Sequence, residues 1–146
     1  MLILDANIIL RYLLDDNAVM AQKAEEYLAA GNAWVTVEVV AEVVYVLKGV
    51  YSLKREIIAE TVKAFLAMVN CQEKAVLHAA LDSYAGNTLD FVDCVLYAYH
   101  AVNGAEIATF DNKLLKLLAG PDGQKGVAVG FEDAGGNVSG ALHGEA

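Results

Sequence analysis

The chain has 146 residues, of which 57% are hydrophobic and 20% are charged, and its formal net charge is −9. This length suits one domain with one sizeable core. The acidic balance excludes a module that binds nucleic acid through basic charge alone, but not a nuclease whose acids hold a metal ion, because a bound cation reverses the local sign. No apolar stretch approaches the ~18 residues of a membrane span and Asp5 comes too early for a signal peptide, so we expect a cytoplasmic protein with no membrane segment.

The first half of the chain alternates short apolar runs with helical patterns. Residues 2–4 are predicted to form a buried strand, 7–14 a helix, 18–30 a second helix and 33–36 a second strand. Residues 37–49 are rich in valine and ambiguous by propensity. Their length and their adjacent valine pairs favour a buried helix over an alternating strand.

The second half continues the alternation. Residues 52–70 are predicted to form a long amphipathic helix, 75–77 a third strand and 79–86 a short helix. Residues 90–103 show a helical apolar stripe, and 106–109 read as a fourth strand. Strands that alternate with helices indicate a parallel sheet with right-handed crossovers.

The end of the chain has a different composition. Residues 114–119 are the last clear helical pattern, and 127–129 are a candidate fifth strand. Eight of the 12 glycines lie between Gly120 and Gly144, so we expect weak order there. The sequence therefore predicts one α/β domain over 1–120, a three-layer α/β/α sandwich with a parallel sheet of about five strands, followed by a Gly-rich segment over 121–146. Cys71 and Cys94 are expected to be free thiols, because their spacing fits neither a zinc site nor a disulfide framework.

Four acids recur at the carboxyl ends of predicted strands or in the first turns of the helices beside them. They are Asp5, Glu42, Asp93 and Asp111. In an open parallel sheet, ligands bind in the crevice beyond the carboxyl ends of the strands, so we expect the four acids to meet at one edge. The alternative for Asp5 is that it only caps the helix that follows it.

Glu42 lies within a markedly apolar run. Glu38 and Glu42 are the only charged residues between positions 37 and 47. Burying an ionised carboxylate costs several kcal/mol, so a buried Glu42 must be paired, protonated or bound to a metal. The alternatives are a salt bridge to Arg11 or Lys48, or simple exposure. Glu38 comes one turn earlier and is ranked below Glu42.

The other acids also have simpler readings. Asp93 shares one helix face with Asp90, Tyr97 and His100, and this could be a solvated face. Asp90 is best read as a helix cap, and Asp111 could cap the helix that begins near residue 114.

The pattern of acids nevertheless suits one kind of chemistry. Several carboxylates at one site repel each other unless a cation lies between them. Ligation by oxygen alone points to Mg²⁺ or Mn²⁺. Such a site suits phosphodiester cleavage by a metal-activated water. No Ser–His or Cys–His constellation competes, because the three histidines have no motif around them, and the glycine-rich end lacks a phosphate-binding loop pattern.

Four segments, in the right order and spacing, resemble the motifs of PIN-domain ribonucleases. In the third, the family's acid falls on Asp93 and not on Asp90. In its compact length, the chain is most similar to the VapC-type toxins of toxin–antitoxin pairs. The segments are residues 3–13, 41–47, 89–96 and 108–114.

The resemblance implies a five-stranded parallel sheet of order 3-2-1-4-5, in which strands one and four are neighbours. It also implies an Mg²⁺-dependent (or Mn²⁺-dependent) endoribonuclease that cleaves RNA, forms a homodimer and is inhibited by a cognate antitoxin protein. One departure is Ala6, where the family often has a hydroxyl residue.

Carried over residue by residue, the resemblance assigns roles. Asp5, Asp93 and Asp111 would be metal ligands, directly or through water. Glu42 would be a fourth catalytic acid, as a ligand or as the group that orients the attacking water. The groups expected to support these carboxylates are Asn7, Thr109 and Asp90. The candidates for contact with RNA phosphates, which could equally be ordinary surface charges, are Arg11, Lys48 and Lys113.

Two other functions fit the same residues. One is a catalytically idle binding module that keeps the fold. The other is a metal-dependent 5′-nuclease or phosphatase that uses the same acids.

Overall fold

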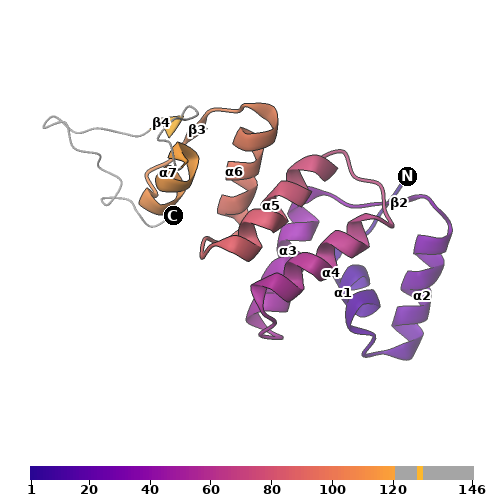
Figure 1. Cartoon of the computed structure of the whole chain (residues 1–146). Helices are drawn as coiled ribbons and strands as arrows, with labels where there is room; N and C mark the ends of the chain where they lie inside the picture. The colour runs from indigo at the N-terminus through magenta and orange to yellow at the C-terminus, as the bar shows by residue number, and fades with distance from the viewer. Residues whose placement is uncertain (121–127, 130–146) are drawn as a thin grey trace, which may run out of the picture.

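The computed structural model describes residues 1–120 and 128–129, and in this part helices predominate (Figure 1). The helices are α1 (Ala6–Leu14), α2 (Ala18–Ala29), α3 (Val37–Gly49), α4 (Arg55–Leu66), α5 (Lys74–Gly86), α6 (Phe91–Asn103) and α7 (Asn112–Ala119). The strands are β1 (Leu2–Ile3), β2 (Ala33–Trp34), β3 (Ile107–Ala108) and β4 (Ala128–Val129). The expected α/β alternation is therefore present, with strands shorter than predicted.

Short polar residues start several helices where the sequence changes pattern. The Asn17 side-chain oxygen accepts a hydrogen bond from the Met20 backbone N–H at 3.1 Å, which starts α2. The Thr36 hydroxyl accepts one from the Val39 N–H at 3.3 Å, which starts α3. Each such cap stabilises a helix by about 1 kcal/mol. These caps fix where the connecting segments end, and so where the following side chains point.

The core is built from one face of each central helix. In α3 the buried side chains recur at helical spacing, and they are Val40, Val43, Val44 and Leu47. Helix α5 packs between α4 and α6 and buries Val76, Leu77, Ala80, Leu81 and Tyr84. Full burial of one such aliphatic side chain contributes about 1.5–3 kcal/mol. This continuous core carries α6, the helix of Asp93, on the far side of α5 from α4 (Figure 1).

The described strands form two separate parallel pairs. β1 pairs with β2, and β3 pairs with β4. An isolated parallel bridge joins Trp34 of β2 to Asn70, which places a third chain segment beside β2. The pairs lie at opposite ends of the molecule, β2 near the N-terminus and β3 beside α7 (Figure 1). The predicted order contains these neighbours, but strands one and four are not paired in the described residues, and the five-stranded sandwich is not confirmed.

The predicted strand at 75–77 is wrong. These residues form the first turn of α5, which runs as one helix from Lys74 to Gly86. A short apolar run cannot be told from a buried helical segment by periodicity alone, and here the following buried positions continue the helical spacing. The segment that lies beside β2 is instead at Asn70, whose backbone N–H donates to the Ala33 carbonyl at 2.9 Å.

The remaining boundaries differ in detail. Helix α4 is shorter than the predicted 52–70 helix. Both cysteines are free, with Cys94 fully buried and Cys71 half-buried. No helix in the part of the chain that the structure describes is long and apolar enough to cross a membrane. The expectation of weak order over 121–146 falls outside the described residues, apart from β4.

Candidate functional site

Asp93 lies in the first turn of α6 and is half-buried. Its pKa is raised above the ordinary carboxyl value, first by burial and then by the negative charges of Asp111 and Asp90. The charges of two other acids, one before α6 and one before α7, therefore act on Asp93. A group that is partly desolvated and surrounded by like charge favours either a proton or a bound cation.

Asp111 begins α7 and is fixed by two hydrogen bonds. Its carboxylate oxygen accepts from the Leu114 backbone N–H at 3.0 Å, so the capping reading is correct. Its own backbone N–H donates to the Thr109 hydroxyl at 3.0 Å. Thr109 therefore supports the Asp111 backbone. The Asp111 carboxylate caps α7 and its charge also acts on Asp93.

Asp90 occupies the position before α6 but does not cap it with its side chain. The connection that precedes it is held by Arg55 of α4, which donates from Nε to the Tyr84 carbonyl at 2.7 Å and from Nη2 to the Leu89 carbonyl. The same guanidinium lies 3.7 Å from the centre of the Tyr84 ring. Arg55 thus fixes the end of α5 relative to the acids at the start of α6.

Asp5 lies elsewhere. It is exposed and caps α1, accepting a hydrogen bond from the Asn7 backbone N–H at 2.6 Å. Asn7 therefore contacts Asp5 through its backbone. Helix α1 packs against α2 and α3, whereas α7 packs against α6 at the other side of the molecule (Figure 1), and the described residues do not unite Asp5 with Asp93 and Asp111 in a group placed to hold a metal ion. The physical reason is the strand pairing, because β3 pairs with β4 and not with β1.

The predicted burial of Glu42 is wrong. Glu42 is exposed on α3, because the valines around it turn inward at helical spacing while Glu38, Glu42 and Tyr45 lie on the outer face. The alternative of simple exposure is the one that the structure shows. The role of Glu42 as a catalytic acid stays a prediction that no contact in the described residues supports.

The described residues contain no group of three or more His, Cys, Asp or Glu side chains placed to hold a metal ion. They supply one interacting cluster of carboxylates around Asp93, while Asp5 and Glu42 are separate from it. In this arrangement the donor set does not complete the expected Mg²⁺ or Mn²⁺ site.

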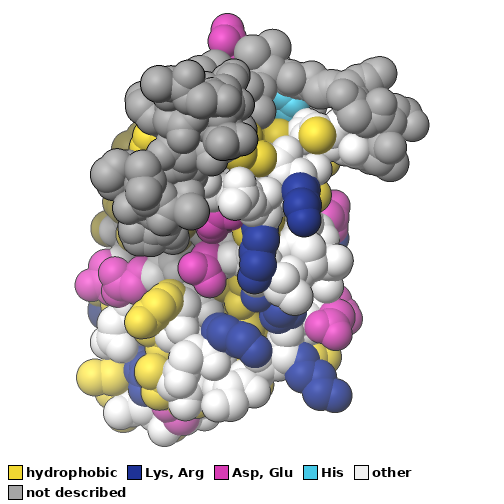
Figure 2. All heavy atoms as spheres, turned by 90° about the vertical axis from the view of Figure 1, so that its left-hand side faces the viewer, with side chains coloured by type: hydrophobic (Ala, Val, Ile, Leu, Met, Phe, Trp, Pro, Cys, Tyr) yellow, Lys and Arg dark blue, Asp and Glu magenta, His cyan; other side chains and the backbone are white. Residues whose placement is uncertain are grey.

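The three predicted cations have different surroundings. Arg11 pairs with Asp16, with Nη1 2.8 Å from the carboxylate, which is the ordinary surface role. Lys113 is exposed on α7. Lys48 lines a cleft of about 400 Å³ that also includes Arg55 and Asp90. Figure 2 shows Lys and Arg side chains gathered on the face at the α6 and α7 end, with acidic side chains beside them.

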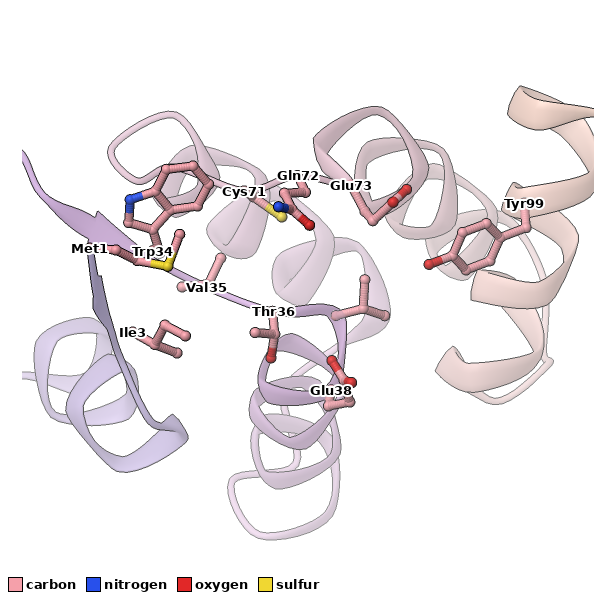
Figure 3. Close-up of a pocket in the computed structure, with 11 residues that line it drawn as sticks. Met1, Ile3, Trp34, Val35, Thr36, Glu38, Cys71, Gln72, Glu73 and Tyr99 are labelled. Carbon is pink, nitrogen blue, oxygen red and sulfur yellow. The ribbon is translucent and has the colours of Figure 1, made fainter.

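A larger cleft, of about 590 Å³, is lined by β1, by residues 34–38 and 71–73 and by Tyr99, and its lining does not include Asp90 or Asp93. Figure 3 shows Met1 and Ile3 on one side of it and Glu73 and Tyr99 on the other. The pKa of Tyr99 is raised, first by burial and then by the charges of Glu73 and Glu38. Its walls are mainly apolar, so it is a poor place for a bare metal ion.

Sequence reasoning missed two residues that shape the site. Arg55 lay inside a predicted amphipathic helix, where nothing marked its charge as inward-facing. Asn87 accepts from the Leu89 N–H at 2.8 Å and donates to the Ser83 hydroxyl at 2.9 Å. The Gly–Asn pair at 86–87 is a turn signal that could have identified it.

Comparison with protein families gives a match over most of the chain. The model described as "PIN domain" matches residues 2–119. Such a match supports an α/β fold and a nuclease-type activity. Searches of curated proteins and of solved structures gave no significant match.

Proposed function

Because this chain belongs to the PIN domain family, we propose that it is a divalent-metal-dependent endoribonuclease and the toxin of a VapBC-type toxin–antitoxin pair. The family supports hydrolysis of a phosphodiester. The RNA substrate, the Mg²⁺ or Mn²⁺ requirement and the toxin role go beyond the family match and are what we propose.

The proposal rests mainly on the surroundings of the Asp93 carboxyl group. Partial burial, and then the like charges of Asp111 and Asp90, raise its pKa, and this arrangement is unfavourable at neutral pH without a compensating cation. Divalent metals with oxygen ligands supply that compensation and also activate water for attack on phosphate. Asp111, whose charge acts on Asp93, is held in place by the cap of α7.

The surface near these acids suits a polyanion. Lys48 makes no ion pair in the described part of the chain, and it lines the cleft that contains Asp90. Lys113 follows Asp111 by two residues on an exposed helix surface. Basic side chains next to acids that bind a metal would hold RNA phosphates by charge while the metal acts on one of them.

Partners and location belong to the same proposal. Family membership and the compact matched segment support a homodimer that acts on cytoplasmic RNA and is blocked by a cognate antitoxin. The gene next to this one should then encode a short protein that, when purified with this chain, forms a complex and suppresses its cleavage.

The test is RNA cleavage with and without metal. Purified full-length protein should cleave single-stranded RNA in Mg²⁺ or Mn²⁺ and should lose at least about 100-fold of that rate in excess chelator, because the metal supplies the activated water. Adding Mn²⁺ back should restore the rate. Equal cleavage in chelator would contradict the mechanism.

A second candidate function has one observation in its favour. The described residues contain no group of three His, Cys, Asp or Glu side chains placed to hold a metal ion, as expected of a catalytically idle binding module. That function predicts no cleavage in any metal together with intact folding. A metal-dependent 5′-nuclease or phosphatase would instead be revealed by release of mononucleotides or of phosphate from small esters.

A further inference from the structure

The cleft that Lys48 shares with Asp90 opens between α3 and the start of α6. Tyr45 and Lys48 line it from α3, and Asp90 and Val92 line it from the other side. Its volume is about 400 Å³, which is within the range of clefts that hold small organic groups. Asp93 follows Asp90 by three residues, so a group bound in this cleft lies next to the acids of the proposed site.

The buried side of the cleft is aromatic and held in place. Tyr84 lines it and is 3% exposed, and its ring meets that of Phe91 edge-on at 5.7 Å. The Arg55 guanidinium lies 3.7 Å from the centre of the Tyr84 ring and donates to the Tyr84 and Leu89 carbonyls. The cleft is therefore preformed, because its inner wall is fixed by contacts that a ligand does not need to break.

Two apolar side chains at the mouth of the cleft remain in water. Tyr45 on α3 is 77% exposed and Val92 on α6 is 59% exposed. No aromatic ring in the part of the chain that the structure describes stacks on that of Tyr45. An exposed aromatic ring is a platform for unpaired nucleobases, and bases held by enzymes are stacked between aromatic and apolar side chains. A flat group with a polar edge fits between Tyr45 and Val92.

The charges of the cleft match the two ends of a nucleotide. Lys48 follows Tyr45 by one helical turn, so the two side chains share a face of α3. Lys48 is exposed and makes no ion pair within the described residues, which leaves its ammonium for a phosphate. On the other side, the Asp90 side chain does not cap α6. Its ionised carboxylate can only accept hydrogen bonds, so it requires a base edge that donates.

Guanine is the RNA base that fits a carboxylate best. Its Watson–Crick edge presents two donors side by side, N1–H and the N2 amino group. Adenine and cytosine each present one donor beside an acceptor, and uracil presents one donor between two acceptors. Unpaired RNA bases are read on these edges, and an acceptor that faces another acceptor is left without a partner, at a cost in binding.

We propose that this cleft binds an unpaired guanosine of the RNA substrate. The base lies between Tyr45 and Val92, its N1–H and N2 amino group donate to the Asp90 carboxylate, and its phosphate lies at Lys48. This inference rests on the proposed function for the identity of the substrate, and it adds a base preference beside the cleaved bond. Asp90 is then a specificity-determining residue.

The test is binding of short RNA to the full-length protein in excess chelator, so that the RNA stays intact. Fluorescence anisotropy compares labelled oligouridylates that carry one guanosine, inosine or adenosine at the same central position. The guanosine oligomer should bind about 10-fold more tightly than the adenosine oligomer, because a bidentate contact discriminates to about this degree. Inosine keeps N1–H but lacks the amino group, so its affinity should lie between the two.

Substitutions at Tyr45 test the stacking. Tyr45→Leu should weaken binding of the guanosine oligomer about 5- to 100-fold, which is the range for loss of one base–aromatic stack. Tyr45→Phe is the matched control, because it keeps the ring, and its affinity should stay within about twofold of wild type. Lys48→Met should weaken all three oligomers by the same factor, as expected of a phosphate contact.

Substitution of Asp90 tests the reading of the base. Asp90→Asn places a donor beside an acceptor, the pattern that pairs with adenine, so the preference should move from guanosine to adenosine. The ratio of the two affinities is the readout, because a merely structural role of Asp90 would weaken both alike. Asp15→Asn removes the same charge at the end of α1 and should keep the preference for guanosine.

Three results would overturn the guanosine site. They are equal affinities of wild-type protein for the guanosine and adenosine oligomers, an unchanged preference in Asp90→Asn, and wild-type affinity in Tyr45→Leu. If Tyr45→Leu also converts a dimer into a monomer in sedimentation while guanosine binding is unchanged, the cleft is covered by a second copy instead.

Failure of this inference is distinguishable from failure of the proposed function. Wild-type protein that shows the predicted binding but cleaves no RNA in Mg²⁺ or Mn²⁺ would refute the nuclease and leave the guanosine site standing. Wild-type protein that cleaves RNA in Mn²⁺ equally well with or without guanosine would refute the guanosine site and leave the nuclease standing.

Discussion

Replacing Asp93 by Asn is expected to reduce metal-dependent RNA cleavage at least about 100-fold while the domain stays folded. Asn keeps the size of the side chain but removes the charge that binds a cation. Because Asp93 interacts with Asp111 and Asp90, it is the acid whose loss should weaken the site most.

The same substitution should make the metal-free protein more stable at neutral pH. The pKa of Asp93 is raised in the folded protein, so the folded state binds the proton more tightly than the unfolded state does. The stability that this gives is fully present below the ordinary carboxyl pKa and is lost as pH rises through the raised value. At pH 7 the ionised group opposes folding, and Asn removes that opposition.

Thermal unfolding with and without Mn²⁺ measures both effects. Metal-free Asp93→Asn should melt at or above the wild-type temperature, and Mn²⁺ should raise the melting temperature of wild-type protein only. Asp15→Asn is the matched control, because Asp15 has φ 50° at the end of α1, a conformation that Asn tolerates. A lower melting temperature for metal-free Asp93→Asn would contradict the like-charge account.

Replacing Arg55 by Met is expected to lower the free energy of unfolding by about 2–4 kcal/mol, because two carbonyls lose a charged donor and Tyr84 loses its stacked cation. Arg55 joins the start of α4 to the Tyr84 and Leu89 carbonyls. Met keeps the apolar stem, so the loss isolates the guanidinium. Cleavage should also fall, since Asp90 directly follows the connection that Arg55 holds.

Urea denaturation compares the free energy of unfolding of Arg55→Met with that of its neighbour Lys54→Met. Lys54 is exposed and makes no capping hydrogen bond, so its replacement should change stability by less than about 0.5 kcal/mol. Arg55→Lys should recover only part of the loss, because one ammonium does not reproduce the planar fork. Equal midpoints for Arg55→Met and Lys54→Met would show that the guanidinium contacts contribute nothing.

Local pattern predicted most of the helices. The valine pairs of residues 37–49 indicated a buried helix, and Val40, Val43, Val44 and Leu47 form its inner face. The strand predicted at 75–77 was wrong because a run of only three apolar residues shows no periodicity that separates a strand from a helix. Long-range pairing is harder to predict, because the preference of β1 for one strand over another depends on contacts distant in the sequence. The neighbour of β2 at Asn70 had no local signal.

The same holds for the acids: their places in local elements could be predicted from the sequence, but their contacts across the fold could not. Asp93 was found from its place in the first turn of a helix and Asp111 from its place after a predicted strand, and the charge of Asp111 acts on Asp93 in the structure. Glu42 was overvalued, because apolar neighbours in the sequence do not bury a side chain that points to the opposite face of the helix. Whether Asp5 joins the cluster depends on which strand adds to β1, and no sequence pattern near Asp5 contains that information.

Calorimetric titration of Mn²⁺ into the full-length protein tests the central claim, that the carboxylates of Asp93 and Asp111 hold a divalent ion. Wild-type protein and Asp15→Asn should show saturable binding, and Asp93→Asn and Asp111→Asn should show none at the same concentrations. Unchanged binding after either substitution, or no saturable binding to wild-type protein, would contradict it.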